Sequence, residues 1–139
     1  MTLSDEELRR ILADARRIAV VGLGDNPARP AYGVARYLQK QGYRIAPIHP
    51  RDHEALGERV YRSLEEAAAD GPVDVVDVFR RSDAIPELVA PCVAIRPRVV
   101  WLQVGVRNDR AADALNAAGI PVVQNRCLAV EHHRLAGTP

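Results

Sequence analysis

A glycine-containing segment near the start of the chain, GLGDNPARP at 22–30, has residue types suited to holding a phosphate group. Gly22 and Gly24 follow an apolar run, and they let the backbone turn sharply and approach a ligand without an intervening Cβ. A helical pattern comes next, with Pro30 suited to its first turn, and the free N–H groups at the start of a helix bind anions. Any strand-to-helix turn favours glycine, however, and the third glycine of the dinucleotide-binding motif is absent, so these residues alone leave a nucleotide role open.

The loop His49-Pro50-Arg51 follows the second apolar run and bears on which nucleotide could bind. NAD-binding domains carry an Asp or Glu at the end of this strand, where its carboxylate holds the ribose 2′-hydroxyl. No acidic residue stands there in this chain, which argues against NAD. Arg29 and Arg51 have planar guanidinium groups that suit a phosphate, such as the ribose phosphate of NADP or coenzyme A, although an exposed arginine more often only faces solvent.

Catalytic side chains do not form a recognisable set in this sequence, which has no P-loop, nucleophile elbow or CxxC motif. His132 and His133 are adjacent, so on a helix they point about 100° apart and are poorly placed to share a metal ion. His49 and His53 flank a proline-containing loop. We therefore expect all four histidines to face solvent, and we predict no metal site and no catalytic residue.

The loops need elements to position them, and the apolar pattern of the chain predicts five strands. Their Val- and Ile-rich runs lack polar alternation, which is typical of parallel strands buried on both faces. The expected strands span 18–21, 43–48, 73–79, 99–103 and 120–123, and Pro121 favours an edge position for the last of them. Expected helices begin after the N-caps Ser4, Ser63, Ser82 and Asn108 or Asp109, and two more span 32–41 and 128–135. Pro91 is expected to kink or end the helix that Ser82 begins.

Alternating strands and helices predict right-handed crossovers and an α/β fold, a doubly wound five-stranded parallel sheet of the Rossmann-like type. The length of 139 residues is sufficient for one domain, 1–139, and hardly for two. Ligands of such sheets bind beyond the carboxyl ends of the strands, where the strand order reverses. This rule selects the loops at 22–30, 49–51, 80–83, 105–108 and 125–127.

Composition excludes several classes of partner. The net charge of +1 provides no basic field for nucleic acid. Cys92 and Cys127 form no disulfide framework and indicate a reducing compartment. No signal-peptide core is present, and no apolar run reaches the roughly 18 residues of a membrane span. We expect a cytoplasmic protein without a nucleic-acid or membrane partner. A homodimer is expected only because homodimers are common among soluble proteins, and no residue pattern in the chain supports it.

Five motifs in order make the chain resemble the small CoA-binding proteins, whose fold is similar to that of the CoA-binding domain of the succinyl-CoA synthetase alpha subunit. The motifs are GLGDNPARPAYGVARYLQKQGYRIAPIHP, LGERVYRSLEEA, VDVVDVFRRSDA, VVWLQVGVRND and AGIPVVQNRCLAVEHHRL, which together span nearly the whole chain. The resemblance implies a single Rossmann-like domain that binds coenzyme A or an acyl-CoA at the carboxyl ends of the strands. It implies no reaction, because most members have none known.

The resemblance also implies a set of ligand-binding residues. Those matching its motifs are Gly22, Gly24, Asn26, Pro27, Arg29, Pro30, His49, Pro50, Phe79, Arg80, Gln103, Gly105, Val106, Arg126 and Cys127. Arg51 joins them as a candidate for a ligand phosphate. Two positions depart from the family pattern: Ala31 stands where Ser is common, and Asn125 stands where Asp is common. These changes remove a hydroxyl donor and a negative charge.

Cys127 carries one chemical hypothesis, a mixed disulfide with the thiol of CoA under oxidising conditions. Its neighbour Arg126 and a following helix would favour the reactive thiolate, whereas the alternative is an ordinary buried cysteine, which we favour. Two further functions stay open. One is an oxidoreductase domain that uses NADP, and the lack of a second, substrate-bearing domain argues against it. The other is a protein-interaction module that has lost its ligand, for which Ala31 and Asn125 leave room.

Overall fold

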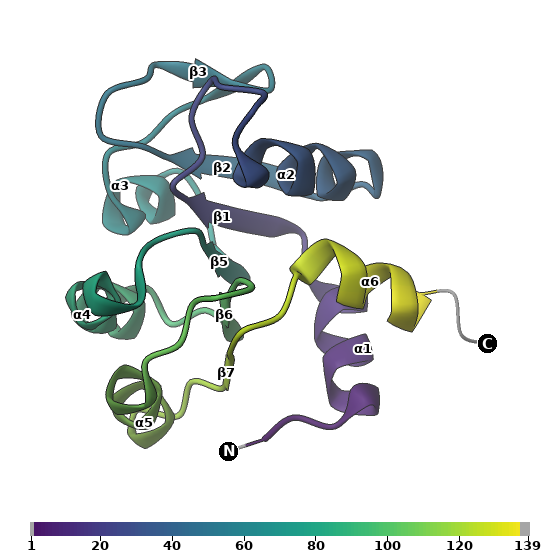
Figure 1. Ribbon diagram of the computed structural model, residues 1–139, viewed down its shortest axis with the longest axis vertical. Coiled ribbons are helices and arrows are strands. Elements are labelled where there is room, and N and C mark those ends of the chain that lie inside the picture. Colours follow the sequence, from purple (N-terminus) through teal and green to yellow (C-terminus); the bar gives the residue numbers. More distant parts are fainter. Residues whose placement is uncertain (1, 137–139) are drawn as a thin grey trace.

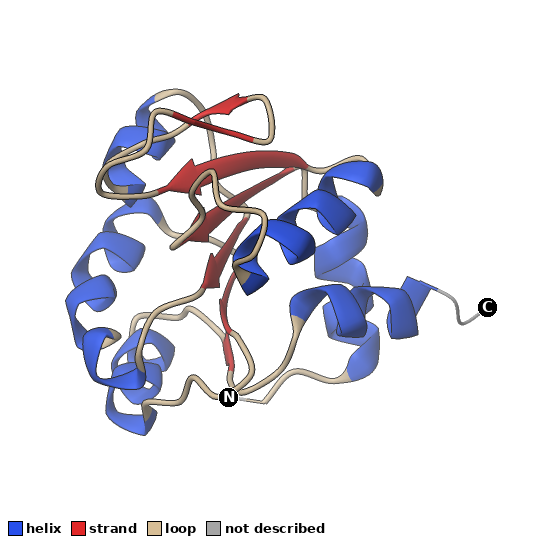
Figure 2. Ribbon diagram, turned by 45° about the horizontal axis from the view of Figure 1, so that its top comes forward, coloured by secondary structure: helices blue, strands red, loops and turns tan. Residues whose placement is uncertain are grey.

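The computed structural model describes residues 2–136 and contains a five-stranded parallel sheet between two layers of helices (Figures 1 and 2). The strand order is β2-β1-β5-β6-β7, and every neighbouring pair is parallel. The strands are β1 (Arg17–Val21), β2 (Arg44–Ile48), β5 (Val75–Val78), β6 (Val99–Leu102) and β7 (Val122–Val123). The predicted fold class is therefore confirmed, and so is the edge position of the last strand.

Helices cover both faces of the sheet, three on each (Figure 1). One layer consists of α1 (Asp5–Asp14), α2 (Pro30–Lys40) and α6 (Leu128–Ala136), and the other of α3 (Leu64–Ala69), α4 (Pro86–Ile95) and α5 (Asp109–Ala117). Successive strand residues point to opposite faces, so Val20 joins the core under the first layer and Val21 the core under the second. This two-sided burial explains why the strands read as continuous apolar runs.

Side-chain caps begin three of the helices as the sequence predicts. Ser4 and Glu7 form a reciprocal capping box, with both bonds at 3.1 Å. The Ser63 hydroxyl accepts a hydrogen bond from the N–H of Glu66, and the Asn108 side chain accepts one from the N–H of Ala111. These caps satisfy N–H groups that the first turn of a helix leaves without an intrahelical partner.

Two expectations about α4 are wrong. Ser82 does not cap it but opens a short 3-10 turn, η1 (Ser82–Ala84), and its hydroxyl accepts a hydrogen bond from the N–H of Arg107 in the next loop. Pro91 was expected to kink or end the helix, and it does not end it, because the helix continues four residues further to Ile95. The helix tolerates the missing hydrogen bond because it packs between α3 and α5 and buries Cys92 completely.

The boundaries of the other elements differ modestly from those expected. Four strands are shorter than predicted, so that Phe79 and Gln103 lie just beyond the ends of β5 and β6. A small hairpin, β3 (Glu54–Ala55) and β4 (Glu58–Arg59), was not predicted and follows β2. Its two-residue strands are too short to leave a pattern of alternating polarity in the sequence.

The topology reverses between β1 and β5. The chain passes from β1 outward to β2 and then returns to β5 on the other side of β1. The loops after β1 and β5 therefore diverge at the carboxyl edge of the sheet, which is the place where ligands bind in folds of this type. Among the described helices, none is both long and apolar enough to cross a membrane.

Candidate functional site

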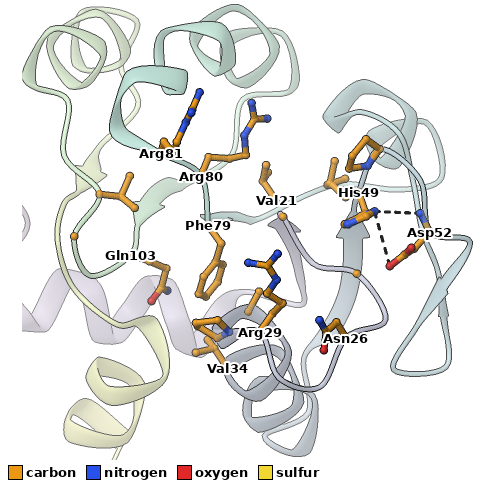
Figure 3. Close-up of a pocket in the computed structure, with 18 of the residues that line it drawn as sticks. Val21, Asn26, Arg29, Val34, His49, Asp52, Phe79, Arg80, Arg81 and Gln103 are labelled. Atoms are coloured by element: carbon orange, nitrogen blue, oxygen red, sulfur yellow. Dashed lines mark hydrogen bonds and ion pairs between the residues drawn. The ribbon is translucent and has the colours of Figure 1, made fainter.

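A cavity of about 1160 Å³ opens at the carboxyl ends of the strands (Figure 3). The loops after β1, β2, β5 and β6 line it, together with the start of α2. The predicted site residues that line it are Gly22, Gly24, Asn26, Arg29, Pro30, His49, Pro50, Arg51, Phe79, Arg80, Gln103, Gly105, Val106 and Cys127. Pro27 and Arg126 are absent from its lining. Five separate segments of the sequence thus come together at one place.

Gly22 is required where the first loop leaves the sheet. Its φ of +97° lies in a region that side chains disfavour, and a Cβ there would overlap the carbonyl oxygen of Phe79. Its own N–H donates to the carbonyl of Ile48 at 2.9 Å. Gly22 therefore lets the end of β1 pass closely between the ends of β2 and β5.

Gly24 is required for a different reason, the contact between the loops after β1 and β2. A Cβ at this position would overlap the Asp52 carboxylate and would lie 2.8 Å from the His49 ring. The Asp52 carboxylate accepts a hydrogen bond from the N–H of Asp25 at 2.7 Å. This backbone N–H holds the pKa of Asp52 below its usual value, so the carboxylate is committed to joining the two loops.

His49 has a defined tautomer in this arrangement. Its Nδ1 accepts hydrogen bonds from the backbone N–H groups of Arg51 and Asp52, both at 3.1 Å. The proton of the neutral ring must then lie on Nε2. Nε2 is on the cavity side of the ring, directed away from Asp52 (Figure 3). His49 thus presents an N–H donor to the cavity.

The arginines around the cavity have different roles. Arg62 donates to the backbone carbonyls of His49 and Asp52, at 2.9 and 2.6 Å, and so holds the loop after β2. Arg80 pairs with Glu87 at 3.5 Å, and Arg81 with Asp83 at 3.3 Å.

Arg29 and Arg51 differ from these three arginines. Within residues 2–136 their guanidinium groups form no ion pair or hydrogen bond, so both are available to an anion. Arg29 is also the N-cap of α2, and its side chain makes no capping bond. Of the first three residues of this helix, Pro30 has no N–H and Tyr32 donates its N–H to the Arg29 carbonyl at 3.1 Å, so the N–H of Ala31 is the one left available at the cavity.

The cavity has a polar and an apolar side. We call Asn26, Arg29, His49, Arg51 and Asp52 its polar side, and Val34, Phe79, Gln103, Val104 and Val106 its apolar side, and the paired Arg80 and Arg81 follow Phe79 in the lining. Val104 is 68% exposed although it is a large aliphatic residue. Exposed apolar residues at a cavity commonly contact a ligand.

Gln103 is the polar exception on the apolar side and has a buried partner. It is only 4% exposed, and its Nε2 donates to Oδ1 of Asp77 at 2.6 Å. Asp77 is fully buried in β5, and this burial raises the pKa of its carboxyl to about 7, although the hydrogen bond from Gln103 lowers it. Sequence reasoning missed Asp77, whose signal is an acidic residue inside the apolar run VDVVDVF.

The segment after β7 contributes less than expected. Arg126 turns its guanidinium to Glu131 at 3.2 Å, and its carbonyl accepts a hydrogen bond from the Trp101 indole at 2.9 Å. Cys127 lines the cavity and is half-buried. Asn125 has a φ of +58°, which asparagine tolerates, and its side chain accepts a hydrogen bond from the N–H of Gly105 at 2.7 Å. Ala31 is buried at the start of α2.

Other residues of the cavity and the chain were not foreseen. Asp52, Arg62 and Val104 line the cavity without having been predicted, and Arg81 lies in the predicted loop 80–83 but was not named as a site residue. His132 does not face solvent as expected but is buried, with its Nδ1 2.9 Å from the Tyr37 hydroxyl, and burial lowers its pKa. In the described part of the chain no group of His, Cys, Asp and Glu side chains is suited to holding a metal ion.

Comparison with known proteins identifies a family and several similar chains. Residues 16–133 match the model of a family described as CoA binding domain. Over 129 residues the chain is 40% identical to the uncharacterized protein YneT of Bacillus subtilis, covering 93% of this chain and 94% of YneT. The structure of cell-free ID.343 from Thermus thermophilus is 46% identical with a TM-score of 0.90, covering 96% of this chain and 99% of that one.

A more distant similarity involves a larger protein. Over 78 residues the chain is 28% identical to the alpha subunit of an ADP-forming acetate–CoA ligase II from Pyrococcus furiosus. The match covers 55% of this chain but only 17% of that subunit. It therefore concerns one segment of the larger protein.

Proposed function

This chain belongs to the CoA binding domain family, and on that premise we propose that its cavity binds coenzyme A or an acyl-CoA. The observation that carries the proposal is that two arginines, which form no ion pair or side-chain hydrogen bond within residues 2–136, lie with an uncapped helix start in a cavity that apolar residues such as Phe79 and Val106 also line. CoA has the same division, since its phosphates are anionic while its adenine and pantetheine arm are largely uncharged. We propose no catalytic step.

The polar side suits the phosphates of CoA. Arg29 and the N–H of Ala31, at the start of α2, form a site for the diphosphate. Arg51 and the Nε2–H of His49 lie on the neighbouring loop and suit the ribose 3′-phosphate. The imidazole N–H and the guanidinium are both hydrogen-bond donors suited to a phosphate.

The apolar side suits the uncharged parts of the ligand. Phe79 and Val106 offer apolar surface to the adenine ring or the pantetheine chain, and Val104 is open to a ligand at the cavity mouth. The cavity volume of about 1160 Å³ exceeds the roughly 300–1,000 Å³ usual for drug-sized ligands, as a long ligand requires.

The redox alternative is less well supported by the loop after β2. Asp52 is the acidic residue nearest to the position where NAD-binding domains hold the ribose hydroxyls. Its carboxylate lies further along the loop and accepts the N–H of Asp25 at Oδ2, so it joins the loops after β1 and β2 instead of ending β2 as the acidic residue of NAD-binding domains does. NADP shares a ribose phosphate with CoA, so it must be compared directly.

The test is the thermal stability of ligand-stripped protein with CoA, acetyl-CoA, 3′-dephospho-CoA, NADP and NAD. A ligand that binds only the folded state adds about 2.7 kcal/mol at 100 times its Kd. We expect stabilisation by CoA and acetyl-CoA and less by 3′-dephospho-CoA. Stabilisation by NADP alone would replace the proposal with the redox alternative. No effect of any ligand at millimolar concentration would favour an interaction module.

A further inference from the structure

The buried carboxyl of Asp77 is the least expected group near the cavity. Asp77 lies in the central strand β5, opposite Val20 of β1 and Trp101 of β6, and none of its surface is exposed. Its Oδ1 accepts the hydrogen bond from Gln103, but its Oδ2 has no hydrogen-bond partner in the described residues. Burying such a group costs free energy, so a purely structural strand position would favour an apolar residue.

Gln103 connects this carboxyl to the cavity. It follows β6 directly, and its side chain lies in the cavity wall beside Phe79 (Figure 3). A primary amide has a donor end and an acceptor end, and Oδ1 of Asp77 accepts from the donor end whether Oδ2 is ionised or carries a proton. Because Nε2 donates to Asp77, the end that remains for the cavity is the carbonyl oxygen, Oε1.

An unrestrained glutamine would not have this property. Rotation about its last bond exchanges the amide nitrogen and oxygen, so a free Gln103 would offer a ligand either a donor or an acceptor. The 2.6 Å bond to a buried acceptor removes that choice. Burying Asp77 costs free energy, but it fixes the Gln103 amide so that a hydrogen-bond acceptor faces the cavity among the apolar residues.

We propose that Asp77 is a positioning residue, which orients the Gln103 amide so that its Oε1 accepts a hydrogen bond from an N–H or O–H group of the bound ligand. The inference rests on the proposed function, since it concerns how the same cavity recognises its ligand. CoA has such donors in the amino group of its adenine and in the amides of its pantetheine arm.

The test compares three variants with the wild type by calorimetric titration with CoA. Asp77→Val removes the acceptor with a residue favoured in strands, and Gln103→Leu removes the amide. The double variant replaces both partners with apolar groups and is expected to fold even if Gln103→Leu alone, which leaves Asp77 unpaired, does not. Val76→Ala is the matched control, because Val76 is equally buried in β5 but packs on the opposite face.

We expect Asp77→Val and Gln103→Leu each to weaken CoA binding about 3- to 10-fold, the range for a lost hydrogen bond. The double variant should be no weaker than either single variant, because both remove the same contact. Val76→Ala should lower thermal stability and leave the Kd unchanged. Wild-type affinity in both Asp77→Val and the double variant would overturn the inference.

Two additional measurements distinguish the outcomes. The side-chain amide resonances of Gln103 in ligand-free protein report its fixed orientation directly, and Asp77→Val should shift them and speed their exchange with solvent. Adenosine 3′,5′-bisphosphate and pantetheine locate the donor, since only the fragment that contains it should bind more weakly to the variants. Failure of wild-type protein to bind CoA would refute the proposed function, whereas equal binding by wild type and variants would refute only the role of Asp77.

Discussion

The polar and apolar sides of the cavity are stabilised in different ways. On the polar side, exposed loops are held by hydrogen bonds, such as those of Arg62 to the carbonyls of His49 and Asp52. On the apolar side, Phe79 and Gln103 directly follow the strands β5 and β6, and Gln103 is buried together with its partner Asp77. Changes on the polar side should therefore affect ligand affinity more than folding, whereas changes at the strand ends should affect folding strongly.

Asp77 provides the largest expected effect. Its pKa rises from the model-compound value of 3.8 to about 7 in the folded protein, so between these values the folded state holds a proton that the unfolded state has lost. Stability should therefore fall as the pH rises from about 4 to about 7. A difference of about three pKa units corresponds to about 4 kcal/mol.

Urea unfolding of wild type and Asp77→Asn across this pH range measures the effect. The asparagine does not titrate, so the stability of the variant relative to wild type should increase by about 4 kcal/mol from pH 4 to pH 8. Using the difference between the two proteins removes the contribution of other titrating groups. A difference independent of pH would show that the buried carboxyl is not the cause.

Gly22→Ala should give the next largest loss of stability. The new Cβ would overlap a backbone carbonyl, that of Phe79, at a positive φ, and neither can relax easily. We expect the free energy of unfolding to fall by at least about 2 kcal/mol. Gly33→Ala is the control, since no atom lies within 4 Å of its added Cβ and alanine favours α2. Equal stability of the two variants would contradict the close passage of β1.

Arg51→Ala tests the polar side by affinity instead. Loss of a charged hydrogen bond to the 3′-phosphate should weaken CoA binding about 10- to 100-fold, with thermal stability of the free protein unchanged. Binding of 3′-dephospho-CoA should not change, because it lacks that phosphate. Arg36→Ala, an exposed arginine outside the cavity lining, should match wild type in all three measurements. An equal loss for both ligands would assign Arg51 to another part of CoA.

Gly24→Ala tests a contact between a glycine and side chains of a neighbouring loop, whereas Gly22→Ala tests a contact with a backbone carbonyl. Its Cβ meets the movable side chains of Asp52 and His49, not a carbonyl, so the cost in stability should stay below about 1 kcal/mol. Displacement of His49 should nevertheless weaken CoA binding about 3-fold. Calorimetric titration beside thermal unfolding distinguishes this variant from Gly22→Ala, in which stability changes most. A larger loss of stability than in Gly22→Ala would show that the contact between the two loops limits stability more than the close passage of β1 does.

Cys127 and Cys92 should differ in their reactivity towards oxidised CoA, with little effect on the free energy of unfolding. Its thiolate would attack oxidised CoA to form a protein–CoA disulfide and release one CoA thiol, and it lines the cavity. Cys92 is fully buried, which raises its pKa to about 12, so it should not react. Intact mass spectrometry should detect one CoA adduct on wild type and none on Cys127→Ser. An unmodified wild-type protein would leave Cys127 as a structural residue.

Much of the fold could be predicted because its signals are local. Apolar runs indicate buried parallel strands, and caps such as Ser4 and Asn108 act within one helical turn. The ends of the strands were less predictable. Phe79 and Gln103 each lie one residue beyond a strand, and their residue types would fit equally well within it. Pro91 was misread because packing against α3 and α5 outweighs the local preference to end a helix.

The candidate site also has features that local sequence signals predict and features that depend on tertiary contacts. Sequence motifs by themselves determined the α/β class, the family, and the five loops that meet at one edge of the sheet, because parallel strands place their carboxyl ends together. Only the tertiary structure decided which side chains are free to act. It joins Arg126 to Glu131 and leaves Arg29 and Arg51 available, gives His49 its tautomer, and sets Asp77 beside Gln103. The physical reason is that burial and hydrogen bonding depend on neighbours distant in sequence, as the separation of 26 residues between Asp77 and Gln103 illustrates.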